Sequence, residues 1–371
     1  MEKLIVSKKD LYHNIEIVKN YISEHAQGKM PRIIGVVKAN GYGMGLLELS
    51  NEYIQKGIDM LAVSKYEEGI ELRQNNIYCD ILFLSSTAIP SEAKQVVEND
   101  IIPTIGSIES LNVYNEIGKE RQEKINVHIK VETGFSRHGI RLDDIDNFVQ
   151  EYNKCEYIQI SGIFTHFIES FASDSTEVDK QYQSYMQFID KLKEKINLDN
   201  VMLHVCNSSA VFKYPNYYLD AVRVGSAFIG SLPFENSLGL KKLGHLECEV
   251  VEIKRIKKGD SIGYGKIYIA PNDMTLAIVQ AGYTSGIGVQ IQNNNVGFLA
   301  MLRQIKHEIK KYIKKENLTC IINDKKYNIV SGIRMNNIFI DVTNSKVKIG
   351  DKVKINVYPS LVDSKIKREY M

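Results

Sequence analysis

The chain is poor in cysteine, and its cysteines follow no pattern that signals a bond or a metal site. It has five in 371 residues, an odd number, and no Cys-x-x-Cys pair occurs among Cys79, Cys155, Cys206, Cys248 and Cys320. This argues against a disulfide framework and against a cysteine-based metal centre. The pattern predicts reduced thiols in a cytoplasmic protein, with no resident metal.

The chain also lacks an excess of charge of either sign and any long apolar run. Its 47 basic and 45 acidic residues give a formal net charge of +2, so nothing indicates a nucleic-acid partner. No stretch approaches the roughly 18 apolar residues of a membrane span, and the first ten residues contain no apolar signal region. We expect a soluble cytoplasmic chain that makes no membrane contact itself. The alternative is the cytoplasmic domain of a longer membrane protein.

Short apolar runs alternate with amphipathic segments up to about residue 230. Segments such as 66–75 and 176–194 have apolar spacing near 3.6 residues, which is typical of helices. Eight strand-like runs lie between such segments: 33–37, 60–64, 81–85, 101–105, 125–131, 158–164, 201–205 and 221–224. This alternation predicts a TIM-type (β/α)₈ barrel over residues 1–238. A doubly wound open sheet would give a similar alternation, so the pattern leaves that fold open.

The pattern changes after about residue 240. One helical stretch, about 297–315, interrupts a series of strand-like runs separated by turn residues: 246–256, 275–280, 319–322, 337–342 and 352–358. We therefore expect a mainly-β C-terminal domain over residues 239–371.

Lys38 is the most informative single residue. It closes the β-branched run 33–37, and the segment that follows, Ala-Asn-Gly-Tyr-Gly-Met-Gly, leaves room beside its amine. An apolar wall lowers the pKa of a lysine, and the neutral amine is the form that attacks a carbonyl carbon. Lys38 is therefore a candidate nucleophile. The structural alternative is a lysine whose stem simply extends past a glycine-rich loop.

Other unusual residues also follow predicted strands. Catalytic groups of a barrel lie at the C-terminal ends of its strands. Here those ends carry Tyr42, Lys130, Arg137, His166, Ser208, Arg223, Gly225 and Ser226. The Ser208 hydroxyl and the backbone N–H groups of Gly225 and Ser226 make an anion-binding concavity that suits a phosphate. We expect one active site at this end of the barrel.

These motifs, in this order, closely resemble those of the bacterial alanine racemases, the pyridoxal phosphate enzymes of fold type III. The resemblance spans residues from about 4 to 345 and implies pyridoxal 5'-phosphate as the cofactor, held by Lys38 and lined by Tyr42. Val-Arg223-Val-Gly matches the motif of the family's arginine at the pyridine nitrogen, and His166 resembles a neighbouring histidine. A guanidinium cannot accept the proton of that nitrogen, so the ring withdraws electrons weakly, which suits racemisation.

Racemisation needs an acid or base on each face of the substrate's α-carbon. Lys38 can serve one face. For the other, Ser-Ile-Gly-Tyr264-Gly resembles a segment that in this family enters the active site of the partner subunit, so a homodimer is expected. The resemblance also implies substrate-binding roles for three residues and carbamylation of a lysine, namely Arg137, Tyr283, Met335 and Lys130.

Two departures from the family bear on the substrate. Asn336 and Ser331 replace the usual aspartate and glycine around Met335, and the short C-terminus has no clear counterpart of the family's phosphate-contacting tyrosine. Asn356 and Tyr358 are the candidates for that place. A smaller amide at Asn356 would give room for a side-chain hydroxyl and would hydrogen-bond it.

The short ending resembles the racemase domains of VanT-type serine racemases of glycopeptide-resistant bacteria. The sequence therefore predicts a racemase of serine and alanine. The alternatives are a plain alanine racemase and a non-catalytic barrel protein that binds pyridoxal phosphate. A decarboxylase of the same fold type is disfavoured, because Arg223 stands where it would need an acid.

Overall fold

The protein divides into two compact units. The computed structural model describes residues 2–172, 174–235, 237–266, 268–289, 305–306 and 318–371. Lys8–Leu243 form one unit, and Gly244–Met371 together with Met1–Ser7 form the other. Each unit has its own sheet and its own apolar core.

Eight parallel strands of the first unit form a closed ring. Their order is β4-β3-β2-β10-β9-β8-β6-β5, with β2 paired to β10. A bridge from Leu82 to Ile102 joins β4 to the segment before β5 and closes the ring. The strands are β2 (Arg32–Val36), β3 (Met60–Val63), β4 (Asp80–Phe83), β5 (Thr104–Ile105), β6 (Ile125–Glu132), β8 (Ile158–Phe164), β9 (Met202–His204) and β10 (Ala221–Val224). The closure confirms the predicted barrel over the open-sheet alternative.

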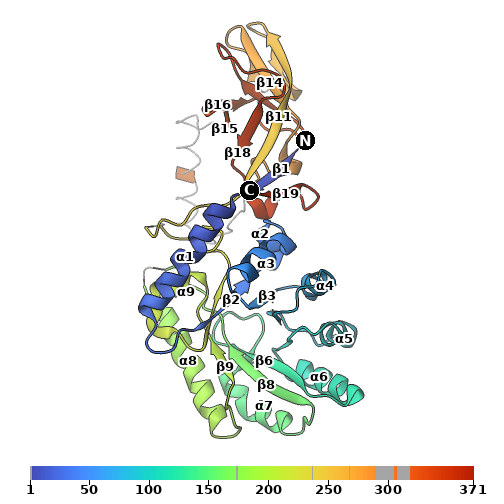
Figure 1. Ribbon diagram of the computed structural model, residues 1–371, viewed down its shortest axis with the longest axis vertical. Helices are drawn as coiled ribbons and strands as arrows, with labels where there is room; N and C mark the ends of the chain where they lie inside the picture. The colour runs from blue at the N-terminus through green and yellow to red at the C-terminus, as the bar shows by residue number, and fades with distance from the viewer. Residues whose placement is uncertain (1, 173, 236, 267, 290–304, 307–317) are drawn as a thin grey trace. The chain divides into compact units, whose positions relative to one another are not determined.

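Helices cover the outside of this ring (Figure 1). They are α1 (Lys8–His25), α3 (Leu46–Gln55), α4 (Tyr66–Gln74), α5 (Pro90–Glu98), α6 (Ile108–Arg121), α7 (Ile145–Tyr152), α8 (Thr176–Lys193) and α9 (Ser208–Lys213). The apolar spacing of α8 puts Val178, Tyr185 and Leu192 on its buried face. The helices predicted over 66–75 and 176–194 correspond to α4 and α8.

The second unit contains an eight-stranded sheet in the order β14-β17-β16-β15-β18-β11-β1-β19, in which β11 also pairs with β14. Its strands are β1 (Lys3–Val6), β11 (His245–Ile256), β14 (Met274–Val279), β15 (Thr319–Ile322), β16 (Lys325–Val330), β17 (Ile338–Asp341), β18 (Lys352–Ile355) and β19 (Lys367–Tyr370). Leu246, Cys248 and Val250 alternate along β11 and are buried in the core of this sheet.

Several details of this unit differ from the predicted pattern. Residues 1–7, expected in the barrel domain, belong here, because β1 pairs with β11 and β19. The expected boundary, 238/239, lies five residues before the observed division at 243/244. Strand β16 was not expected, since its first residues are polar. The helix expected over 297–315 falls almost wholly outside the described residues. No helix in the described part of the chain has the length and apolarity to cross a bilayer.

Candidate active site

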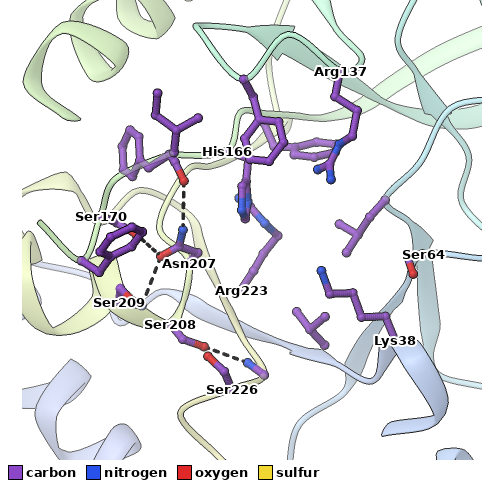
Figure 2. Close-up of a pocket in the computed structure, with 18 of the residues that line it drawn as sticks. Lys38, Ser64, Arg137, His166, Ser170, Asn207, Ser208, Ser209, Arg223 and Ser226 are labelled. Atoms are coloured by element: carbon purple, nitrogen blue, oxygen red, sulfur yellow. Dashed lines mark hydrogen bonds between the residues drawn. The ribbon is translucent and has the colours of Figure 1, made fainter. Parts of the chain in front are cut away.

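The C-terminal ends of the barrel strands surround one cavity of about 320 Å³. Lys38 and Arg137 extend into it from different elements, with Ser208 and Ser226 in another part of its wall (Figure 2). Nine residues predicted for the site line it, namely Lys38, Tyr42, Lys130, Arg137, His166, Ser208, Arg223, Gly225 and Ser226. The convergence of parallel strand ends brings together residues that are far apart in the sequence.

The charge of this cavity is one-sided. Four of its lining residues are basic, Lys38, Lys130, Arg137 and Arg223, and none of the lining residues that the structure describes is an aspartate or glutamate. Several cations gathered in a poorly solvated space repel one another unless a bound anion compensates them. The wall therefore favours a ligand that carries more than one negative group, such as a phosphate and a carboxylate.

Lys38 opens α2 (Lys38–Tyr42), a turn of left-handed helix. The angle φ lies between 54° and 59° at each of the four residues after Lys38, and three of these four are not glycine. Left-handed backbone costs about 1–2 kcal/mol for each such residue. The turn is held at Asn40, whose backbone N–H donates to the carboxylate of Glu68 at 3.1 Å. The side-chain oxygen of Asn40 also accepts from the backbone N–H of Leu46 at 2.8 Å.

The two lysines of the cavity have lowered pKa values. Burial lowers the pKa of Lys38, and the positive charges of Arg137 and Arg223 lower it further. Burial and the charge of Arg137 also lower the pKa of Lys130 to about 8. Both amines are therefore easier to deprotonate than a solvated lysine, as a nucleophile or a proton acceptor requires.

Arg223 lies on β10 and is 3% exposed. Its guanidinium donates to the Nδ1 atom of His204 at 2.9 Å and to the backbone carbonyls of His204, Val205 and Thr165 at 3.0, 3.1 and 2.6 Å. Burial lowers its pKa to about 10, so it stays charged at neutral pH. All these partners are neutral, and none of the ion pairs among the described residues includes Arg223.

The histidine that hydrogen-bonds Arg223 is His204, which was not among the predicted site residues. His204 ends β9, the strand next to β10, and this adjacency of consecutive strands was the available signal. His166 lines the cavity and packs its ring against Phe135, with ring centroids 5.4 Å apart. Burial and then the charge of Arg223 hold the pKa of His166 well below its usual range.

Hydroxyl and backbone N–H groups lie together in the part of the cavity wall that contains Ser208 and Ser226. The Ser208 hydroxyl oxygen accepts from the backbone N–H of Gly225 at 3.1 Å (Figure 2). It also accepts from the backbone N–H of Ala227 at 3.3 Å. A Cβ atom on Gly225 would lie 2.5 Å from the Tyr42 hydroxyl oxygen, so only glycine fits there. Burial raises the pKa of Tyr42, which stays a neutral phenol. These groups lie together in the cavity wall, where the sequence predicts an anion-binding concavity.

Four predicted site residues lie in the second unit. Tyr283 and Met335 are 47% and 55% exposed, and their segments run side by side. The Tyr283 N–H donates to the Arg334 carbonyl at 3.0 Å, and the Thr284 hydroxyl donates to the Met335 carbonyl at 2.7 Å. Asn356 is exposed and follows β18, whose neighbours are β11 and β15.

The segment of Tyr264 is tied to the same part of that unit. Tyr264 begins a short 3₁₀ turn (Tyr264–Lys266), but its side chain lies outside the described part of the structure. Just before it, the carbonyl of Ile262 accepts from the Ser331 hydroxyl at 2.7 Å. Three motifs predicted from the sequence, around Tyr264, Tyr283 and Met335, are thus neighbours within one unit.

Comparisons with known proteins match both units of the chain to one family. The alanine racemase N-terminal domain model matches residues 6–233, and the alanine racemase C-terminal domain model matches residues 244–366. Alanine racemase 2 of Caldanaerobacter subterraneus subsp. tengcongensis is 29% identical over 355 residues, 94% of this chain and 84% of that protein. The alanine racemase of Methanococcus maripaludis is 29% identical over 350 residues, 92% of this chain and 87% of that protein.

A solved structure gives the same match. The alanine racemase of Clostridium difficile 630 superposes with a TM-score of 0.85 and 27% identity, covering 100% of this chain and 95% of that chain. The relatives named here are alanine racemases, so the closer resemblance to VanT-type serine racemases stays a prediction.

Proposed function

The chain belongs to the alanine racemase family, whose enzymes depend on pyridoxal phosphate, and on that premise we propose that it interconverts L- and D-alanine. It is a pyridoxal phosphate-dependent isomerase. One observation carries the proposal: a single cavity brings together a lysine of lowered pKa, Lys38, and a buried arginine, Arg223. Among the described residues, the cavity lining contains no acidic residue and Arg223 has no carboxylate partner.

The donors of the barrel cavity fit pyridoxal 5'-phosphate. The amine of Lys38 would hold the aldehyde carbon, and the Ser208 hydroxyl with the N–H groups of Gly225 and Ser226 would hold the phosphate. Arg223 would face the pyridine nitrogen. When bound, the cofactor supplies an electron-withdrawing ring that makes the substrate's α-hydrogen acidic.

Lys38 and Arg223 divide the remaining work. The lowered pKa of Lys38 suits it to take the α-hydrogen and return one on the same face. Arg223 remains protonated and can only donate, so it leaves the ring nitrogen without a proton. That arrangement limits electron withdrawal, which favours return of a proton to the α-carbon over loss of the carboxylate or of the amino group.

The opposite face needs a second acid or base. We assign it to Tyr264 of the partner subunit, because its segment lies beside those of Tyr283 and Met335 within the second unit. The segments of Tyr264 and Met335 resemble parts of the family that act across a dimer interface. A homodimer is the assembly that this assignment requires.

Arg137 would bind the substrate carboxylate. Its guanidinium lies over the ring of Phe135 at 4.3 Å, and its backbone N–H donates to Glu132 at 3.3 Å. As an ammonium, Lys130 would add to the positive charge of this cavity. Addition of CO₂ to its neutral amine would release a proton and leave a carbamate anion, which would turn a repulsive pair with Arg137 into an attractive one.

The relatives favour the plain alanine racemase over the predicted racemase of serine and alanine. Serine stays a second substrate on one observation, an amide at Asn356 where the chain has no clear counterpart of a family tyrosine. An apolar pocket rejects an added hydroxyl only by about 100-fold. Modest serine turnover is therefore expected whether the family tyrosine or Asn356 occupies this place.

The test is to incubate the cofactor-loaded chain separately with L-alanine and L-serine and to measure both enantiomers by chiral chromatography. We expect D-alanine from L-alanine, with a slower yield of D-serine. Lys38→Met should abolish both, while Lys65→Met, at an exposed position outside the cavity lining, should change neither. A serine rate equal to the alanine rate would restore the serine prediction. Absence of any D-product would leave the non-catalytic binding protein as the remaining alternative.

A further inference from the structure

Two buried histidines lie behind Arg223 in the barrel interior. The Nδ1 atom of His204 is 2.9 Å from the Arg223 guanidinium, and its Nε2 atom is 3.0 Å from Nδ1 of His128 on β6. His204 and His128 are 0% and 2% exposed. Arg223, His204 and His128 therefore form one hydrogen-bonded chain, which starts at the cavity wall and ends inside the barrel.

The proton positions along this chain follow from its first member. An arginine only donates, so the Nδ1 atom of a neutral His204 must accept, and its proton must sit on Nε2. That N–H then donates to Nδ1 of His128, whose own proton must be on Nε2. The opposite tautomer of His204 would set two donors face to face at Arg223. The donor on Arg223 and the acceptor on His128 thus favour the same tautomer of His204, from its two sides.

Both imidazoles stay neutral in this environment. Burial lowers the pKa of His128 to about 3, and the charges of Arg223 and Arg32 act in the same direction. Burial holds the pKa of His204 well below its usual range, and Arg223 and His128 add to the effect. No acidic side chain is among the groups that shift either pKa.

Strand β8 shapes the space around both rings. A Cβ atom on Gly162 would lie 2.4 Å from Cε1 of His128, so the missing side chain is what admits that ring. Phe164 stacks on His204 with ring centroids 4.9 Å apart and an interplanar angle of 14°. The rings are fixed in place by packing as well as by hydrogen bonds.

We propose that His128 is a positioning residue for catalysis: its Nδ1 atom selects the His204 tautomer that accepts from Arg223, and this orients the guanidinium toward the cavity. The inference rests on the proposed function, since Arg223 matters only if a cofactor ring nitrogen faces it. His128 itself does not line the cavity. A purely structural histidine at this place would affect stability without affecting the arginine.

The first test uses the cofactor-free protein labelled with ¹⁵N-histidine. We expect NMR to show His204 protonated at Nε2 and not at Nδ1 between pH 6 and 8, and this result does not depend on racemase activity. His204 protonated at Nδ1, or cationic in that range, overturns the proposal even if the enzyme racemises alanine.

The second test compares two replacements of similar size. His128→Asn keeps a hydrogen-bond acceptor near the position of Nδ1, and His128→Leu removes it. We expect His128→Leu to lower kcat for alanine about 10-fold, with little change in KM and a changed absorption band of the bound cofactor. His128→Asn should stay within about threefold of the native kcat and keep the native band, since it retains the acceptor.

His245→Leu is the control, because it removes a half-buried imidazole in the second unit and should leave kcat and the band unchanged. Equal kcat values and bands for His128→Leu and His128→Asn overturn the proposal. If His128→Leu does not fold, His128→Asn still decides: a native tautomer with a native band supports the proposal, and a native band with the other tautomer refutes it. Absence of D-alanine from the native protein counts against the proposed function and not against the tautomer assignment.

Discussion

Glu68 should control how well the protein holds its cofactor, although it does not line the cavity. Its carboxylate accepts from the backbone N–H of Asn40 at 3.1 Å and from those of Ser64 and Lys65 at 3.3 Å each. In Glu68→Gln the amide offers one oxygen and points its NH₂ group at N–H donors. Loss of charge-assisted bonds at this half-buried carboxylate costs about 2 kcal/mol.

That loss acts on a strained segment. Three non-glycine residues of the turn after Lys38 hold left-handed backbone, which stores about 3–6 kcal/mol in all. If the turn relaxes, Lys38 moves, and a penalty of about 2 kcal/mol weakens cofactor binding about thirtyfold. Ala39 is exposed with φ of 56°, so Ala39→Gly should relieve about 1 kcal/mol of strain and recover about fivefold of the affinity in the Glu68→Gln background.

The assay is a pyridoxal phosphate titration of the cofactor-free variants, followed by borohydride reduction and peptide mapping of the modified lysine. Glu67→Gln removes the same charge one residue away at an exposed position and serves as the control, with affinity within about twofold of native. Native affinity in Glu68→Gln, or no gain from Ala39→Gly in that background, would refute the account of the turn.

Three further predictions concern the barrel cavity and its surroundings. The folded pKa of His128, about 3, lies below the unfolded value of 6.5, so the unfolded chain binds more protons between these values and stability falls as pH drops through this window. His128→Leu should therefore reduce the slope of the unfolding free energy against pH by about 1.4 kcal/mol per pH unit. Urea titrations at pH 5 and pH 6 measure this slope. An unchanged slope would mean that the native imidazole is charged. Gly225→Ala should weaken cofactor binding at least about tenfold in the same titration, since its Cβ atom would meet the Tyr42 hydroxyl at 2.5 Å, and native affinity would show that the cradle lies elsewhere. Under ¹³CO₂, Lys130 should give a carbamate carbon signal in NMR that Lys130→Met lacks, while a signal in both would assign it to another amine.

The barrel and most of its cavity could be predicted from the sequence because both depend on simple regularities. Eight short apolar runs define eight strands, and parallel strands deliver Lys38, His166 and Arg223 to the same edge. Strand β1 escaped prediction because it is a four-residue run directly before a helix, and its parallel partner β19 lies at the other end of the chain.

Contacts that depend on backbone path or on inward-facing polar groups were not predictable. Glu68 meets Asn40 only because the turn after Lys38 is left-handed, and three of its four residues carry no glycine signal. His128 lies on β6, where apolar and polar residues alternate, and it shares a face of the strand with Lys130. That pattern does not reveal that His128 is buried or which residue it contacts. The contact between His204 and Arg223 depends on the pairing of β9 with β10, which the sequence pattern does not show.

Racemisation of L-alanine in D₂O tests the central claim most directly, because it follows the hydrogen on the α-carbon. With Lys38 on one face and Tyr264 of the partner subunit on the other, each early D-alanine molecule should carry one deuterium, while the remaining L-alanine keeps its protium. Mass spectrometry after chiral separation measures both. D-alanine that retains protium would contradict the two-base assignment, and no D-alanine at all would contradict the racemase itself.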